Sequence, residues 1–288
     1  FCDEEKSIET IKAAIDNGVN CIDTAPTYGG MRGNSETITG KAINGIRDKV
    51  IIATKFGTDP ATSRSAIKGG GTKQYIMGAV EDSLERLDTD YIDLYQMHFP
   101  DTETPIEETL RALEDLITSG KVRFIGASNF ASWQISESGW TSLTNELNQF
   151  VSLQTRYSIL TRDMEKEILP ACEKHQVSVL PYFPLESGLL TGKVTRDKEP
   201  PKGSRLALWK GAFTSEEKFN IIDKLNDYGA EIGRNILEMS LAWTAHRSQV
   251  GSVLVGATSP EQMIQNIDAI SWDISEEHIK AIDEIVLG

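Results

Sequence analysis

Four side chains that can exchange protons or carry charge lie near the ends of short apolar stretches. Asp23 and Tyr28 belong to CIDTAPTYGG, Lys55 to VIIATKF, and His98 ends YIDLYQMH. Taken singly, each has an ordinary structural explanation, as a turn residue, a solvated charge or a hydrogen-bonded histidine. A carboxylate, a phenol, an ammonium and an imidazole that meet in one place predict a catalytic site. The question is whether the fold brings them together.

Seven stretches rich in β-branched and aromatic residues predict the strands of the protein. They cover residues 19–25, 50–56, 91–98, 122–129, 151–158, 177–184 and 251–257. Nearly continuous apolar strands are typical of a parallel sheet that is buried on both faces.

Segments with helical periodicity separate the predicted strands. One apolar stripe comprises Ile106, Leu110, Leu113 and Ile117, and another comprises Ile76, Val80, Leu84 and Leu87. Thr104 is the predicted N-cap of the first of these helices, Pro105 its first residue and Gly120 the residue past its end. Strand and helix alternate at roughly thirty residues per unit, which indicates right-handed βαβ units.

The predicted fold is α/β, a (β/α)8 TIM barrel that forms a single domain over residues 1–288. A helix over residues 3–17 comes first, so we expect the first of the eight strands to lie upstream of Phe1. Helices near 259–270 and 275–286 follow the last predicted strand, and the stretch 184–234 interrupts the repeat with an insertion. A doubly wound open sheet is the alternative. It would normally carry a G-x-G-x-x-G motif after its first strand, and the sequence has none.

In barrels the chemistry takes place at the carboxyl ends of the strands. Besides the first four residues, the predicted strand ends carry Ser128, Asn129, Gln154 and Tyr182. If the sheet closes, all of these side chains meet at one mouth.

The composition of the chain limits which binding partners and which cellular compartment are expected. The net charge of −14 argues against a nucleic-acid surface, which needs clustered Lys and Arg. Cys2, Cys21 and Cys172 resemble neither a disulfide framework nor a zinc site, which favours a reducing cytoplasm and predicts no bound metal. No apolar run reaches the eighteen or so residues of a membrane span, so no membrane partner is expected.

Six motifs in order along the chain resemble the aldo-keto reductase superfamily, of the bacterial type or the channel-beta-subunit-like branch. They are DTAPTY at 23–28, ATKF at 53–56, YQMH at 95–98, GASNF at 126–130, PYFPLESGLLTGK at 181–193 and GATSPEQMIQN at 256–266. The resemblance implies reduction of an aldehyde or ketone to an alcohol by a nicotinamide cofactor.

The resemblance also implies roles for the first four residues. Tyr28 would be the general acid, because a phenol with an ordinary pKa of about 10 holds its proton at neutral pH. Lys55 would ease ionisation of that phenol, and Asp23 would hold Lys55 in place. His98 would orient and polarise the carbonyl oxygen of the substrate.

The expected cofactor is NADPH, with NADH as the alternative. The resemblance assigns the carboxamide to Ser128, Asn129 and Gln154 and ring stacking to Tyr182. It assigns the rest of the dinucleotide to Phe183, Leu185, Gly188, Lys193, Arg205, Gly256, Thr258, Gln262, Gln265 and Asn266, and it places the adenosine 2′-phosphate near Thr258, Gln262 and Asn266. Many relatives carry a basic residue in place of Gly256 or Gln262, and this chain does not, so NADPH selectivity is open. The substrate pocket is open too, with Met31, Phe56, Phe99 and Trp209 as candidate lining residues.

Two other functions fit some of the same residues. A redox-sensing module like the channel beta subunits would bind the nucleotide with little turnover. A barrel isomerase or aldolase would use Lys55 for a Schiff base, but it leaves Tyr182 and the 256–266 segment without a purpose. We favour the reductase, acting on a small carbonyl substrate as a monomer or homo-oligomer.

Overall fold

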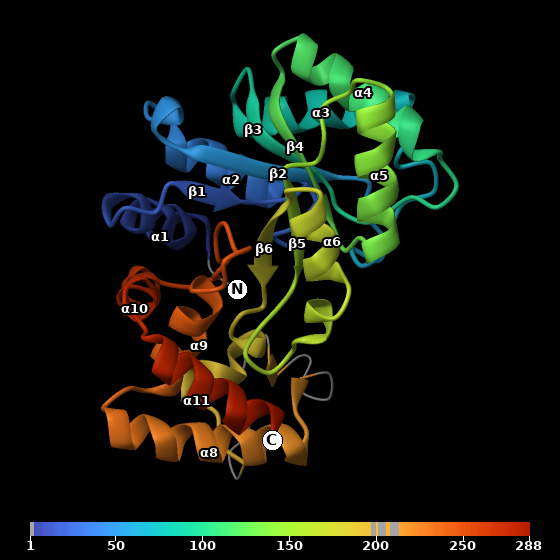
Figure 1. Ribbon diagram of the computed structural model, residues 1–288. Coiled ribbons are helices and arrows are strands. Elements are labelled where there is room, and N and C mark those ends of the chain that lie inside the picture. The colour runs from blue at the N-terminus through green and yellow to red at the C-terminus, as the bar shows by residue number, and fades with distance from the viewer. Residues whose placement is uncertain (1–2, 197–199, 201–205, 208–212) are drawn as a thin grey trace.

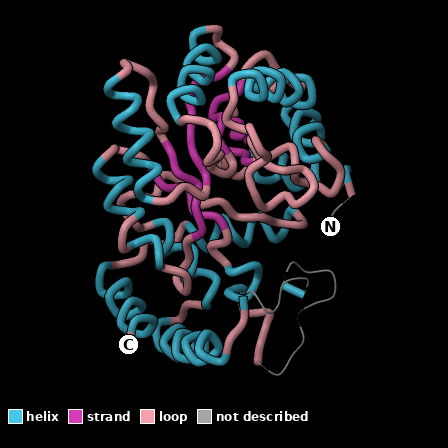
Figure 2. The backbone as a smooth tube through the Cα atoms, turned by 90° about the vertical axis from the view of Figure 1, so that its right-hand side faces the viewer, coloured by secondary structure: helices cyan, strands magenta, loops and turns pink. Residues whose placement is uncertain are grey.

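The computed structural model describes residues 3–196, 200, 206–207 and 213–288. Its centre is a parallel sheet of six strands that pair in chain order. The strands are β1 (Cys21–Asp23), β2 (Ile51–Phe56), β3 (Ile92–Met97), β4 (Val122–Ser128), β5 (Ser152–Arg156) and β6 (Ser178–Tyr182). The sheet curls from β1 to β6 with helices on its outside (Figures 1 and 2). This is the α/β architecture of a (β/α)8 barrel, as the sequence predicted.

Helices lie before, between and after the strands, and those between the strands cover the outer face of the sheet (Figure 1). They are α1 (Glu4–Asp16), α2 (Asn34–Ile43), α3 (Lys73–Leu87), α4 (Ile106–Thr118), α5 (Ser132–Thr144), α6 (Ile168–Lys174), α8 (Glu216–Ile232), α9 (Ile236–Ala245), α10 (Pro260–Ile270) and α11 (Glu276–Leu287). Short 3-10 helices span Arg47–Lys49, Asp163–Glu165 and Glu186–Thr191, the last of which is η3. In the described part of the chain, none of the helices is long and apolar enough to cross a membrane.

Six of the seven predicted strands are confirmed, and the seventh, at 251–257, is wrong as a regular strand. The segment does run beside β6, where Leu254 N donates to Pro181 O and Val179 pairs with Val250 in a single parallel bridge. Among the described residues no strand borders its other edge. Gly251 and Gly256 also weaken extended pairing, because glycine loses more backbone entropy than other residues.

The predicted start of α4 is wrong by one residue. Pro105, with φ −55° and ψ 133°, is the N-cap, and the helix begins at Ile106. Thr104 does not cap the helix because its hydroxyl donates to Asp101 Oδ2 at 2.6 Å. The side chain of Asp101 also accepts from Gly71 N, so it ties this loop to the loop before α3.

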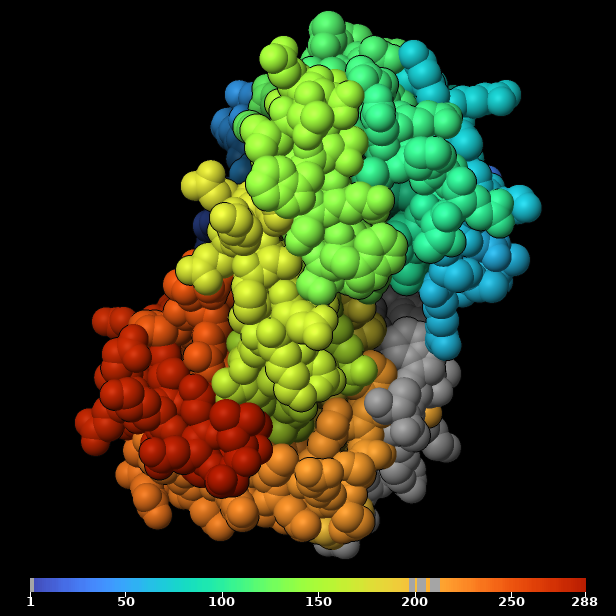
Figure 3. Space-filling model, turned by 45° about the vertical axis from the view of Figure 1, so that its right-hand side comes forward, coloured from blue at the N-terminus to red at the C-terminus, as the bar shows by residue number. Residues whose placement is uncertain are grey.

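The apolar stripes face the core as predicted. Ile76, Val80 and Leu87 on α3 are fully buried, and Leu110 and Leu113 on α4 are too. The C-terminal helices close the other side of the molecule, where Asp283 on α11 accepts from Arg162 at 2.6 Å and from Trp243 Nε1 at 2.8 Å. Figure 3 shows the C-terminal part of the chain, in orange and red, packed against the yellow and yellow-green part.

Two helical glycines should respond to alanine in opposite ways. A Cβ on Gly40 of α2 would lie 2.6 Å from Leu87 O, whereas a Cβ on Gly78 of α3 would meet nothing within 4 Å. We expect Gly40→Ala to lower the free energy of unfolding by about 1–3 kcal/mol through overpacking. Gly78→Ala should raise it by about 0.5–1 kcal/mol, because alanine loses less backbone entropy. Urea titration measures both, and shifts of the same sign would contradict the close packing of α2 on α3.

Candidate active site

The structure brings Asp23, Tyr28 and Lys55 together at the carboxyl ends of β1 and β2. Lys55 Nζ donates to Asp23 Oδ2 at 2.6 Å and to Thr24 O at 3.0 Å. It also makes a side-chain hydrogen bond with Tyr28, and it lies 4.7 Å from the centre of the Tyr28 ring. Lys55 is fully buried, whereas Tyr28 is 37% exposed, so the phenol is the part of this group that a ligand can reach.

The ammonium group of Lys55 keeps its charge. Burial on its own lowers the pKa of Lys55, but the charge of Asp23 and the interaction with Tyr28 outweigh burial and raise the pKa above its ordinary value. A carboxylate within hydrogen-bond distance favours the charged form of a lysine. A positive charge is therefore fixed beside the Tyr28 hydroxyl across the neutral pH range.

The second carboxylate oxygen of Asp23 is held by two glutamines. Gln154 Nε2 donates to Asp23 Oδ1 at 2.7 Å, and Gln96 Nε2 does so at 3.3 Å. Gln154, which was predicted to bind the carboxamide, therefore also supports the ion pair. Gln96 was missed at the sequence level. The signal was its position two residues before His98, which places both side chains on the same face of the strand.

His98 is buried beside Tyr28, with ring centroids 5.8 Å apart and the rings nearly perpendicular. Its other face stacks on Phe99 at 4.9 Å. Burial, and then the nearby charge of Lys55, hold the pKa of His98 well below its ordinary value. The imidazole is thus neutral at pH 7, and its Nδ1 is buried without a hydrogen-bond partner in the described structure.

Ser128, Asn129 and Tyr182 form a second group beside the first. Tyr182 donates its hydroxyl to Asn129 Oδ1 at 2.8 Å, while Asn129 Nδ2 donates to His98 O and Ser128 Oγ. Burial raises the pKa of Tyr182, so its hydroxyl keeps its proton and its role as donor. Asn129 adopts a positive φ of 61°, a conformation that Asn tolerates better than most residues. The half-buried ring of Tyr182 is consequently fixed in orientation.

The segment after β6 turns sharply. Phe183 has a φ of 56°, and Leu185 O accepts from Gly188 N and Leu190 N as η3 begins. Gly188 has a φ of 108°, which glycine alone adopts readily. Lys193 is exposed at the far end of this segment. Arg205 and Trp209, predicted for the cofactor and the substrate, lie outside the described residues.

The predicted phosphate site lies at the start of α10. Ser259 is the N-cap, Pro260 the first helical residue, and Ser259 Oγ accepts from Gln262 N. Gln262 Oε1 in turn accepts from Thr258 N and Thr258 Oγ1. Of the remaining predicted residues, Gly256 and Gln265 are exposed and Asn266 is buried. Free backbone N–H groups and the helix dipole make such a terminus suited to an anion.

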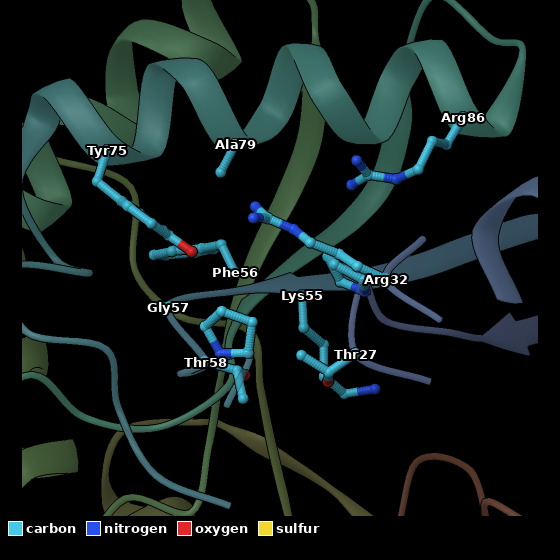
Figure 4. Close-up of a pocket in the computed structure, with 11 residues that line it drawn as sticks. Thr27, Arg32, Lys55, Phe56, Gly57, Thr58, Tyr75, Ala79 and Arg86 are labelled. Atoms are coloured by element: carbon cyan, nitrogen blue, oxygen red, sulfur yellow. The ribbon is translucent and has the colours of Figure 1, made fainter. Parts of the chain in front are cut away.

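A small pocket lies behind Lys55, between the carboxyl end of β2 and α3 (Figure 4). Arg32 extends its guanidinium across it toward α3, between Tyr75 and Arg86. Thr27 Oγ1 and Thr58 Oγ1 line it as buried hydroxyls without a partner in the described structure. Of the predicted substrate-pocket residues, Phe56 instead lies in the core against Tyr95, and Met31 is 74% exposed.

The fold and the site together match a known class of protein. The sequence model of the Aldo/keto reductase family matches residues 1–287. This chain therefore belongs to the aldo/keto reductase family, whose members are oxidoreductases that use nicotinamide cofactors.

Individual relatives cover nearly the whole chain. The Aldo-keto reductase YhdN of Bacillus subtilis is 35% identical over 99% of this chain and 84% of its own length. The NADH-specific methylglyoxal reductase of Escherichia coli is 37% identical over 95% of this chain and 85% of its own length. A putative voltage-gated potassium channel subunit beta of Schizosaccharomyces pombe is 32% identical over 99% and 85%.

The buried neutral state of His98 predicts a pH dependence of stability. The folded-state pKa of His98 is depressed. The unfolded chain therefore takes up a proton near pH 6.5 where the folded chain does not, and the folded state loses stability as the pH falls below about 6.5. In His98→Gln, urea unfolding should show a smaller stability loss between about pH 7.5 and pH 5 than in the wild type. His246→Gln, at an exposed position, is the control. An unchanged pH dependence in His98→Gln would contradict a neutral buried imidazole.

Proposed function

We propose that this protein reduces an aldehyde or ketone to an alcohol, with a nicotinamide dinucleotide as the reductant and Tyr28 as the general acid. The observation that carries the proposal is the buried Lys55–Asp23 pair, which lies against an accessible phenol and a neutral imidazole. Charge, proton donor and hydrogen-bond donor are thus adjacent at one mouth of the sheet.

Tyr28 donates its proton as negative charge develops on the carbonyl oxygen of the substrate. The fixed charge of Lys55 stabilises the phenolate that remains, which makes the phenol a stronger acid during the reaction. Asp23 keeps Lys55 in position and balances its charge in the buried environment. The phenol is the most exposed of the three groups, so the other two act through it.

His98 acts as a neutral hydrogen-bond donor to the same oxygen. A neutral imidazole carries one N–H group, which can orient and polarise a carbonyl without competing with Tyr28 for the role of acid. The ring centroids of Tyr28 and His98 lie 5.8 Å apart, so both side chains can act on one carbonyl oxygen.

The second group of residues suits a nicotinamide. The ring of Tyr182, fixed through Asn129, offers a face for stacking, and the Ser128 hydroxyl and the Asn129 and Gln154 amides offer donors and acceptors for a carboxamide. The nicotinamide, when bound, supplies the hydride. Tyr182 would hold the nicotinamide ring by stacking, beside the mouth that Tyr28 and His98 share.

The start of α10 suits the adenosine end of the dinucleotide. Thr258, Ser259 and Gln262 offer an uncharged polar site at a helix N-terminus. Without a basic side chain in this set, the discrimination between NADPH and NADH depends on the backbone and on polar contacts. We propose NADPH as the cofactor. NADH is the alternative, because one relative is named as NADH-specific.

The second candidate function is nucleotide sensing, because one of the relatives is named as a channel subunit. A sensing role predicts dinucleotide binding with little turnover. The reductase proposal predicts steady turnover with an added aldehyde.

The role of Tyr28 is tested by Tyr28→Phe. We expect a fall in kcat of about 10²–10⁴-fold, because the proton donor is lost, while the dissociation constant for NADPH stays at the wild-type value. The measurement is oxidation of NADPH with an aromatic aldehyde, followed by absorbance. Tyr228→Phe, which removes a hydroxyl bonded to His278 on the far side of the fold, is the control. Wild-type binding of NADPH without oxidation would favour the sensing role.

The adenosine site is tested by Gln262→Glu. Glutamate keeps an acceptor for Thr258 but adds a negative charge beside the proposed 2′-phosphate. We expect the dissociation constant for NADPH to rise at least about tenfold more than that for NADH. Equal weakening of the two cofactors would place the 2′-phosphate elsewhere.

A further inference from the structure

A buried carboxylate outside the group around Tyr28 lies four residues past the end of β6. Glu186 is fully buried, yet its two oxygens accept from four side chains. Oε2 accepts from Arg156 Nη2 at 2.7 Å and from Lys218 Nζ at 2.7 Å. Oε1 accepts from Ser158 Oγ at 2.7 Å and from Thr161 Oγ1 at 2.8 Å. A buried carboxylate satisfied this fully is a fixed point of the structure.

The partners of Glu186 come from segments far apart in the chain. Arg156 is the last residue of β5, Ser158 and Thr161 belong to the turn after it, and Lys218 lies in the first turn of α8. Arg156 also lies over the ring of Phe213, at 4.6 Å from its centre, and Phe213 contacts Phe183. Glu186 thus ties both ends of the connection between β6 and α8 to the carboxyl end of β5.

The backbone at this point needs such support. Phe183, Glu186 and Ser187 have φ values of 56°, 48° and 59°, although none of them is glycine. Left-handed conformations at residues of this kind cost of order 1 kcal/mol each and persist where the surroundings hold them. The segment that contains these three residues follows directly after Tyr182, whose backbone pairs with Arg156 in the sheet register.

The charges of the group also matter for a ligand. Burial alone would raise the pKa of Glu186, but hydrogen bonds from Lys218 and Ser158 and the two cations lower it, so the carboxylate is ionised. One carboxylate between two cations gives these three described residues a net charge of +1, in a chain whose net charge is −14. A local positive charge favours an anion such as a pyrophosphate.

We propose that Glu186 is a positioning residue for the dinucleotide site. Its carboxylate holds the turn after β6, together with Arg156 and Lys218, in the positions that receive the pyrophosphate. This inference rests on the proposed function, because it assumes that a nicotinamide dinucleotide binds along this edge.

The test is the dissociation constant for NADPH and for NADH in the full chain, measured by tryptophan fluorescence. Glu186→Gln keeps the size of the side chain and its acceptor for Ser158 but loses the charge that Arg156 and Lys218 bind. We expect both constants to rise by about tenfold, with kcat at saturating dinucleotide close to wild type. Lys218 is the more exposed partner of the Glu186–Lys218 ion pair. Lys218→Met should therefore also weaken dinucleotide binding, but by a smaller factor. The double variant should lose less binding free energy than the sum of the two single losses, because both substitutions remove the same ion pair.

Glu165→Gln is the matched control. Glu165 accepts from Arg162 and Tyr157, so its loss also breaks a charged network, but that network leads to Asp283 on α11. It should lower the Tm without changing dinucleotide affinity. Glu186→Gln with the dinucleotide affinity of the wild type would overturn this inference alone. Glu165→Gln with an affinity as weak as that of Glu186→Gln would do the same. A wild type that binds neither dinucleotide would overturn the proposed function and this inference with it.

Discussion

The buried ion pair of Lys55 and Asp23 is the interaction on which the site depends. Removing an ammonium from water is unfavourable unless other groups replace the lost hydration. Here Lys55 Nζ has Asp23, the carbonyl of Thr24 and Tyr28 as partners, and Asp23 has both oxygens occupied. The pair is therefore stable only when β1, β2 and the loop that carries Tyr28 are all in place. The chemistry of the phenol and the integrity of the sheet are linked for this reason.

The parallel register of the sheet delivers the other groups to the same point. Lys55 on β2 pairs with Gln96 on β3, and Ser128 on β4 pairs with Gln154 on β5. All strands run in one direction, so residues at their carboxyl ends gather at one mouth. The glutamines link the strands through Asp23, which explains why amide side chains occupy positions that are fully enclosed. Polar groups inside a sheet are tolerated when each has a partner.

The turn after β6 shows the same principle on the other side of the mouth. Its left-handed residues are unfavourable locally, and Glu186 compensates with contacts that reach β5 and α8. Two clusters of buried charges, one around Lys55 and one around Glu186, thus lie at this mouth of the sheet. One buries a cation held by a carboxylate, and the other buries a carboxylate held by two cations. Each depends on elements that are distant in sequence, so the site forms only with the whole sheet.

The sequence by itself determined the order of strands and helices, the parallel architecture and the proximity of Asp23, Tyr28, Lys55 and His98. These follow from local periodicity and from the rule that parallel strands align their ends, so neighbouring residues carry enough information. Small errors arose where a long-range contact overrides a local preference. Thr104 bonds to Asp101 instead of capping its helix, and residues 251–257 run beside β6 without forming a regular strand.

Only the tertiary structure decided which polar groups form hydrogen bonds and ion pairs with one another. Gln154 bonds Asp23 across 131 residues, and Glu186 meets Lys218 across 32. Nothing in the local pattern around Glu186 distinguishes it from a surface residue, because a hydrogen bond depends on distance in space rather than on sequence spacing. The lowered pKa of His98 likewise comes from burial and from Lys55, which lies on another strand. The residue types set the available chemistry, and packing set their ionisation and their partners.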